Sequence, residues 1–198
     1  MLKLAIFDVS NIKYNGEKIG SPYFCQRVND YKTTTDKTRC FYGYVLLKNL
    51  LKEINIELDN LNIITNQFGK PIAENLKYDF SISHSKNLVA VAVSNQNIGL
   101  DVQVVRDCNQ KVAERYFSKF DNEKLNSSKH QDLLFTKLWT KYESSLKLFG
   151  CRKNFCNNAQ PLKHKFKAVK DKEKSKYFLC LTTLKSSHIH SQCLNIFT

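Results

Sequence analysis

The 198-residue sequence predicts an α+β fold built from two similar halves. Apolar residues recur at three- and four-residue steps from Thr38 to Ile54 and again from Leu133 to Phe149, the pattern of a long amphipathic helix. Three strand-like runs follow each helix. This repeated order indicates two α/β subdomains related by a pseudo-twofold axis, residues 1–100 and 101–198. The relation is architectural, because the two halves show no visible sequence identity.

The first half begins with an expected strand at Leu2–Val9. Residues 11–36 are polar and carry two glycines and a proline, so we expect loop or short helix there. Gly69-Lys70-Pro71 forms a predicted turn. The remaining strands expected in this half cover residues 61–65, 80–83 and 88–94.

The second half follows a similar order. Short helices are expected at residues 112–117 and 123–125. The long helix should end at Gly150, because glycine readily adopts the backbone conformation that closes a helix. Its three strands are expected at residues 166–169, 177–182 and 193–197.

The chain is strongly basic, with a formal net charge of +13. Its 42% hydrophobic content excludes a disordered chain. The charge indicates an anionic partner such as a nucleic acid, a membrane surface, a phosphorylated small molecule or an acidic protein. The segment from Cys151 to Thr198 contains ten lysines and arginines but only two acidic residues, Asp171 and Glu173. This segment is either a solvated surface or a docking surface for an acidic partner.

Seven scattered cysteines contain no CxxC pair. Cys151, Cys156 and His164 fit no common zinc spacing, so we expect reduced thiols in a cytoplasmic protein. Residues 1–8 are too short an apolar run for a signal peptide, and no later segment is long enough to span a membrane. We therefore expect no membrane partner.

The segment Ile98-Gly-Leu-Asp-Val-Gln103 is the first candidate for chemistry. On a strand, Leu100 and Val102 would face the core while Asp101 and Gln103 share the other face. Gly99 allows another backbone or a ligand to come close. Asp101 is therefore a plausible ligand for a hard cation such as magnesium, or else an ordinary solvated position.

The long second helix carries another candidate. Phe135, Trp139, Glu143 and Lys147 are spaced four residues apart and form one row along it. Glu143 and Lys147 are either a surface ion pair or an acid and a cation that share a site with a phosphate.

Two shorter segments complete the set of motifs. Phe80-Ser-Ile-Ser-His84-Ser85 places a histidine beside serines at a strand end, which suits either a structural imidazole or a phosphate site. Phe68-Gly69-Lys70-Pro71 is a tight turn that presents a lysine.

In this order, FGKP, FSISHS, IGLDVQ and FTKLWTKYESSLKLFG resemble the Sfp-type 4'-phosphopantetheinyl transferases. The resemblance extends from Thr38 to Gly150 and includes Arg115-Tyr-Phe-Ser118. It implies that family's fold, with a site at the junction of the halves. It also implies transfer of the phosphopantetheine arm of coenzyme A to a serine of an apo acyl or peptidyl carrier protein, giving holo carrier and 3',5'-ADP.

The resemblance further implies roles for single residues. Magnesium, with manganese as an alternative, would be held by Asp101 and Glu143, and by Gln103 through its amide oxygen or a water. Glu143, or a metal-bound water that it orients, would be the base for the serine hydroxyl. Lys147 would neutralise or protonate the leaving phosphate. Coenzyme contacts are implied for Lys70, His84, Arg39, Ser83 and Lys147.

Three positions depart from the family pattern. Gln103 replaces a third carboxylate, Tyr142 stands where lysine is usual, and Cys40 replaces a hydroxyl residue. Lys141 lies about 100° around the helix from position 142 and cannot replace the missing lysine. These departures leave open an alternative: a catalytically weak or inactive protein that binds coenzyme A or the carrier.

A third reading is a basic nucleic-acid-binding protein. The sequence has no zinc-finger, RNP or basic-helix pattern, so we expect no nucleic-acid partner. The carrier would be acidic and would be steered by the basic surface. We also expect a monomer.

Overall fold

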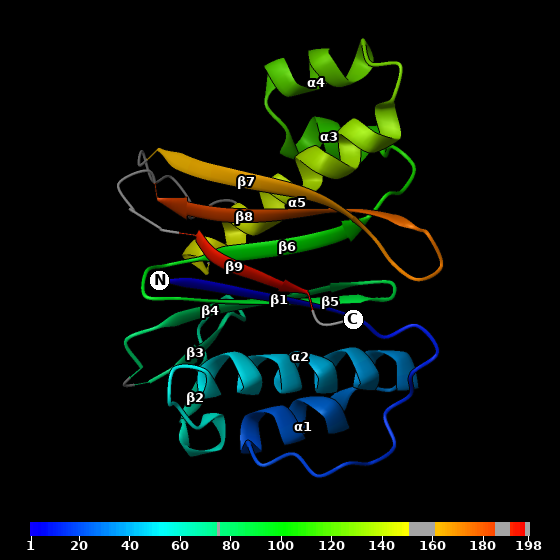
Figure 1. Cartoon of the computed structure of the whole chain (residues 1–198). Coiled ribbons are helices and arrows are strands. Elements are labelled where there is room, and N and C mark those ends of the chain that lie inside the picture. Colours follow the sequence, from blue (N-terminus) through cyan, green and yellow to red (C-terminus); the bar gives the residue numbers. More distant parts are fainter. Residues whose placement is uncertain (75, 151–160, 185–190, 197–198) are drawn as a thin grey trace.

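The computed structural model describes residues 1–74, 76–150 and 161–184, and the backbone of residues 191–196 (Figure 1). Within these ranges the chain is a mixed α+β protein with a four-stranded, a three-stranded and a two-stranded sheet. The predicted α+β class is confirmed. Cys151 and Cys156 lie outside the described residues.

The first sheet has the strand order β4-β5-β1-β9. Strand β1 (Leu2–Asp8) pairs antiparallel with β5 (Leu88–Ser94), which pairs antiparallel with β4 (Asp79–Ser85). On its other side β1 pairs in parallel with β9 (Ser191–Ile196). The last strand of the chain therefore lies beside the first strand.

The second sheet has the order β6-β8-β7. Its strands are β6 (Gly99–Val104), β7 (Leu162–Lys170) and β8 (Lys176–Leu184), all antiparallel to their neighbours. A small hairpin, β2 (Ile63–Thr65) with β3 (Pro71–Ala73), contains the predicted turn at Gly69-Lys70-Pro71. Strand β3 was not predicted, because three residues that begin with a proline carry little strand signal.

The sheets and helices form layers (Figure 1). Helices α1 (Pro22–Asp30) and α2 (Thr34–Lys52), with a 3-10 turn at Leu58–Asn60, cover one face of the first sheet. The second sheet covers its other face. Helix α5 (Gln131–Phe149) packs on β6 and β8, and α3 (Gln110–Tyr116) and α4 (Lys119–Asn126) lie beside one end of α5.

Strand β5 belongs to both hydrophobic cores. Val89, Val91 and Val93 pack in the core under α2, whereas Leu88, Ala90 and Ala92 join the core between the two sheets. Since neighbouring side chains of a strand point to opposite faces, a strand between two packed layers is apolar throughout. This explains why the run at residues 88–94 was recognisable from sequence.

Several element boundaries differ from the predicted ones. Helix α2 begins at Thr34 rather than Thr38, because the hydroxyl of Thr33 accepts a hydrogen bond from the Asp36 backbone N–H at 3.0 Å and caps the helix. Strand β4 continues through Ser85, so only Lys86 and Asn87 form the turn to β5. Lys86 has a positive φ of 47°, which permits this short connection. No helix in the described ranges is both long and apolar enough to cross a bilayer.

Candidate functional site

A cavity of about 400 Å³ lies where α1, α2, the β2–β3 turn, β4 and the end of α5 meet. Five residues singled out in the sequence line it: Arg39, Lys70, His84, Glu143 and Lys147. All five are ionisable groups, and they come from three different elements and a turn. The fold therefore gathers into one space side chains that are up to 108 positions apart in the chain.

Asp101 is buried beside this cavity, with only 1% of its surface exposed. Its Oδ1 accepts hydrogen bonds from Lys147 Nζ at 2.7 Å and from Ser83 Oγ at 2.8 Å. Its Oδ2 accepts one from Gln103 Nε2 at 3.0 Å. A buried carboxylate is costly unless it is paired and hydrogen-bonded, and here both oxygens have partners.

Gly99 determines how closely α5 approaches β6. A Cβ atom at this position would lie 1.9 Å from the Ser144 carbonyl oxygen and 2.5 Å from the Leu148 nitrogen. The predicted close approach at this glycine is thus made by the backbone of α5. This contact brings Lys147, on the last turn of α5, within hydrogen-bond distance of Asp101.

Glu143 lines the cavity one helical turn before Lys147. Burial and the negative charge of Asp101 raise the pKa of Glu143, while Lys147 and Arg106 act in the opposite direction. Arg106 was not predicted from sequence. Its guanidinium lies over the rings of Phe135 and Trp139, 5.5 Å and 5.3 Å from their centroids. These two rings precede Glu143 in the predicted row on α5, and the charge of Arg106 acts on Glu143.

His84 is partly buried and lies near the positive charges of Arg39 and Lys147. Burial, together with Arg39 and Lys147, lowers the pKa of His84 to about 4. The imidazole is therefore neutral near pH 7 and has one N–H to donate. Arg39 is held in place by hydrogen bonds from Nε to the Lys86 carbonyl at 2.7 Å and from Nη1 to Asp36 Oδ1 at 3.1 Å.

Lys70 reaches the cavity from the β2–β3 turn. Its ammonium forms an ion pair with Asp79 at 2.6 Å. Asp79 Oδ2 also accepts a hydrogen bond from the Ile98 backbone N–H at 2.8 Å, immediately before β6. This ion pair therefore joins the turn to the start of the strand that carries Asp101.

Helix α1 contributes cavity residues that the sequence did not single out. Arg27 Nη2 donates to the Tyr31 hydroxyl at 3.2 Å, and both side chains line the cavity. Cys40, on α2, lines the same region, and burial raises the pKa of its thiol to about 11. The signal for α1 was Pro22 at its first position, a common helix start, within a stretch whose polarity favoured loop.

Position 142 packs away from the cavity. The ring of Tyr142 contacts those of Tyr116 and Trp139, with centroids 5.3 Å and 5.6 Å apart. Burial and neighbouring Tyr116 raise the pKa of Tyr142 to about 12, so the phenol stays protonated. The charge of Lys141, together with burial, lowers the pKa of His164 in the second sheet.

The residues present can accommodate a hard divalent cation. Asp101 and Glu143 are close enough for the charge of Asp101 to raise the pKa of Glu143, and the Gln103 amide lies next to Asp101. In the described part of the chain, no three His, Cys, Asp or Glu side chains form a cluster. Two carboxylates suit magnesium, which keeps several waters and is commonly bound together with substrate phosphates.

Comparison with known proteins gives relatives of one kind. The chain is 32% identical over 123 residues to the 4'-phosphopantetheinyl transferase gsp of Aneurinibacillus migulanus, covering 61% of this chain and 52% of that protein. It is 27% identical over 124 residues to the 4'-phosphopantetheinyl transferase psf-1 of Bacillus pumilus, covering 61% and 53%. It is 28% identical over 134 residues to the 4'-phosphopantetheinyl transferase Sfp of Bacillus subtilis strain 168, covering 66% and 60%.

The chain thus spans between 52% and 60% of the length of these three relatives. No protein-family model matches it.

Proposed function

Because this chain is a relative of the Sfp-type 4'-phosphopantetheinyl transferases, we propose that it transfers the 4'-phosphopantetheine arm of coenzyme A to a serine of an apo acyl or peptidyl carrier protein. The observation that carries this proposal is the cavity lined by Arg39, Lys70, His84, Glu143 and Lys147, with Asp101 buried beside it. A polyanionic substrate and a proton transfer both require side chains of these types.

We extend the proposal to the arrangement of the halves. Each of the two larger sheets carries one long helix, α2 or α5, and the cavity is lined from both helices. This supports a pseudo-twofold relation between residues 1–100 and 101–198, with the site at their junction.

Coenzyme A would place its phosphates among the basic residues of the cavity. Arg39 and Lys147 offer charged donors, and the neutral His84 offers one N–H. Charge-assisted hydrogen bonds to phosphate oxygens are the stronger kind and fix the orientation of the bound group. Held in this way, the pyrophosphate is ready for in-line attack by the serine oxygen.

Glu143 would act as the general base. The serine oxygen forms a bond to the phosphorus next to the pantetheine arm, and the bond from this phosphorus to the bridging oxygen breaks, which releases 3',5'-ADP. The hydroxyl proton passes to Glu143, whose raised pKa makes it a stronger base than an exposed glutamate. Lys147 would stabilise the charge that develops on the leaving phosphate.

Asp101 and Glu143, with Gln103 beside them, are the residues that would hold magnesium or manganese. When bound, the ion supplies positive charge to the pyrophosphate. Asp101 and Lys147 already form an ion pair here, so an acid for the metal and a cation for the phosphate adjoin one another.

The partner would be a carrier protein with an acidic surface, since the chain has a net charge of +13. A monomer in the cytoplasm remains our expectation. The described cysteines, Cys25, Cys40, Cys108 and Cys180, are free thiols, which is consistent with a reducing compartment.

Mass spectrometry of an apo carrier incubated with coenzyme A, magnesium and this protein tests the proposal. We expect the carrier to gain the mass of phosphopantetheine on its serine, and a carrier with that serine replaced by alanine to gain nothing. If the carrier stays unmodified while calorimetry still detects coenzyme A binding, the chain is the catalytically inactive binding protein instead.

A further inference from the structure

Strands β4 and β6 belong to different sheets, yet they lie side by side through a row of serine side chains. Ser81, Ser83 and Ser85 alternate along β4, so their side chains point the same way. The hydroxyl oxygens accept hydrogen bonds from three alternate backbone N–H groups of β6, at 3.0, 3.1 and 3.0 Å. The donors, in order, are Leu100, Val102 and Val104.

This serine row sets the register between the two strands. Buried backbone N–H groups need acceptors, and for these three the acceptors are side chains rather than a neighbouring strand. Every pair is 19 residues apart in sequence, so the register between β4 and β6 is the same at all three serines. Asp101 on β6 is thereby fixed beside Ser83, the residue that precedes His84 on β4.

Ser83, in the middle of the row, differs from Ser81 and Ser85. Its hydroxyl oxygen accepts hydrogen bonds from the Val102 backbone N–H and from Lys147 Nζ, the latter at 2.9 Å. The same hydroxyl donates a hydrogen bond to Asp101 Oδ1 at 2.8 Å. A serine hydroxyl has one hydrogen and two lone pairs, so all of its hydrogen-bonding capacity is used. A coenzyme phosphate could gain this hydroxyl only by breaking one of the three contacts.

We propose that Ser83 is a positioning residue that holds Asp101 and Lys147 together, rather than a contact to the coenzyme. This inference rests on the proposed transferase function of the same site. Ser83 is 3% exposed, and besides accepting from the Val102 N–H its single oxygen bonds to the Asp101 carboxylate on β6 and to the Lys147 ammonium on α5. It thus fixes both the buried acid and the cation that are assigned to the pyrophosphate.

Two matched variants separate this role from general stability. Ser83→Ala and Ser85→Ala each remove one acceptor for a β6 N–H, but only the first removes contacts to Asp101 and Lys147. We expect Ser83→Ala to lower the melting temperature more than Ser85→Ala, because it also removes a donor to a buried carboxylate. Hydrogen bonds to charged groups are worth enough for Ser83→Ala to lower kcat by roughly 10- to 100-fold, with the KM for coenzyme A changed by less than about threefold. Ser85→Ala should keep kcat within about threefold, and Ser83→Thr should restore most of the lost rate.

A double-mutant cycle tests whether Ser83 acts through Lys147. If it does, adding Ser83→Ala to Lys147→Ala should lower the rate by much less than Ser83→Ala lowers it in the unmodified protein. Equal factors in both backgrounds would overturn the proposal. If Ser83→Ala does not fold, Ser83→Cys, with a weaker donor and acceptor of similar size, replaces it in every comparison.

Crystal structures of the Ser83 and Ser85 variants give a result that does not depend on activity. We expect the 2.7 Å contact between Lys147 Nζ and Asp101 Oδ1 to be lost in the Ser83 variant and retained in Ser85→Ala. A contact that is unchanged in both variants contradicts the positioning role. If the unmodified protein transfers nothing, the proposed function fails, and this comparison still decides whether Ser83 holds the pair.

Discussion

Glu143 and Asp101 place two carboxyl groups in one largely buried site, and their environments differ. Asp101 accepts hydrogen bonds from Lys147, Ser83 and Gln103. Glu143 lines the cavity, and burial together with the charge of Asp101 raises its pKa. Because neighbouring carboxyl groups in different environments commonly take different roles, we assign the base to Glu143 and the electrostatic role to Asp101.

Replacing Glu143 by glutamine tests this assignment. The substitution keeps the shape of the side chain and removes its basicity, so we expect the transfer rate to fall by roughly 100-fold or more while the protein remains folded. Steady-state kinetics and a thermal melt give the two readouts. Glu114→Gln, at an exposed position on α3, is the control and should leave the rate unchanged. A rate near that of the unmodified protein would contradict the assignment of the base.

The dependence of kcat/KM on pH should report the raised pKa of Glu143. A base works only when it is deprotonated, so the rate falls as the pH drops through that pKa. With the pKa raised, the acidic limb should lie above pH 4.5, the ordinary value for this side chain. The pKa of His84 is lowered to about 4, so its protonation should not produce this limb. An acidic limb at or below pH 4.5 would show that Glu143 is not the titrating base.

At the scale of elements, the tight contact between α5 and β6 sets the position of the site. Gly99→Ala would place a methyl group 1.9 Å from the Ser144 carbonyl oxygen, so helix and strand must separate. Overpacking of this kind costs about 1–3 kcal/mol of unfolding free energy, and we also expect the transfer rate to fall because Lys147 moves with α5. Denaturant titration and kinetics measure both effects.

Gly43→Ala is the matched control for this prediction. It lies on α2, where a new Cβ would be 3.2 Å from a methyl group of Ile82, and alanine favours the helix. We expect a smaller change in stability and no specific loss of rate. Equal effects of the two substitutions would contradict the role given to the contact at Gly99.

The elements also show how much of the fold the sequence could predict. Both long helices and the buried strand β5 have strong periodicity or continuous apolar runs, and they were found within a few residues. Strand β3 was missed because a single proline dominates so short a segment. Helix α1 was expected only as loop or short helix somewhere in residues 11–36, because the polarity of that stretch hides its bounds. The pairing of β9 with β1 could not be read from either strand, since partner choice depends on contacts between distant segments.

The candidate site was likewise predictable from the sequence only in part. Asp101, Glu143 and Lys147 were singled out because their motifs are specific, and the last two line one cavity in the structure. Arg106 and Arg27 were missed because a lysine- or arginine-rich sequence does not reveal which of its charges face a common space. The serine row was visible as alternation, but its partners on β6 required the structure.

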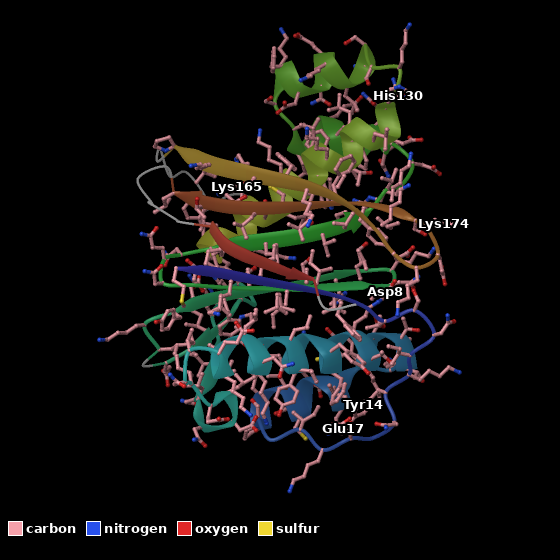
Figure 2. All side chains as sticks on the ribbon, in the orientation of Figure 1. Asp8, Tyr14, Glu17, His130, Lys165 and Lys174 are labelled. Atoms are coloured by element: carbon pink, nitrogen blue, oxygen red, sulfur yellow. The ribbon has the colours of Figure 1, made fainter. Side chains whose placement is uncertain are left out.

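At the scale of the whole molecule, the β7–β8 hairpin concentrates positive charge. Both of its acidic residues are engaged: Asp171 accepts from the Tyr177 hydroxyl at 2.7 Å, and Glu173 pairs with Lys86 at 3.2 Å. Within the described part of the chain, its lysines have no acidic partner, and Lys165 and Lys174 mark the strand and the turn (Figure 2). The exposed lysines of the hairpin are Lys163, Lys165, Lys170, Lys172, Lys174 and Lys176.

These lysines should attract an acidic carrier. We expect rising ionic strength to raise the KM for the carrier more than the KM for coenzyme A, because exposed charges are screened whereas the cavity groups are shielded. Replacing Lys165 and Lys174 by glutamate should raise the carrier KM and weaken its salt dependence. Lys13→Glu, at an exposed position outside the hairpin, serves as the control. Equal effects of the three changes would indicate that only net charge matters.

The central claim is that acids from β6 and α5 and basic residues around one cavity act together on the pyrophosphate of coenzyme A. A crystal structure with coenzyme A and magnesium tests it most directly. We predict the pyrophosphate in the cavity, hydrogen-bonded to Lys147 and Arg39, with one metal ion bound by both Asp101 and Glu143. Coenzyme bound elsewhere, or a pyrophosphate in the cavity with the two carboxylates pointing away from it, would contradict the account.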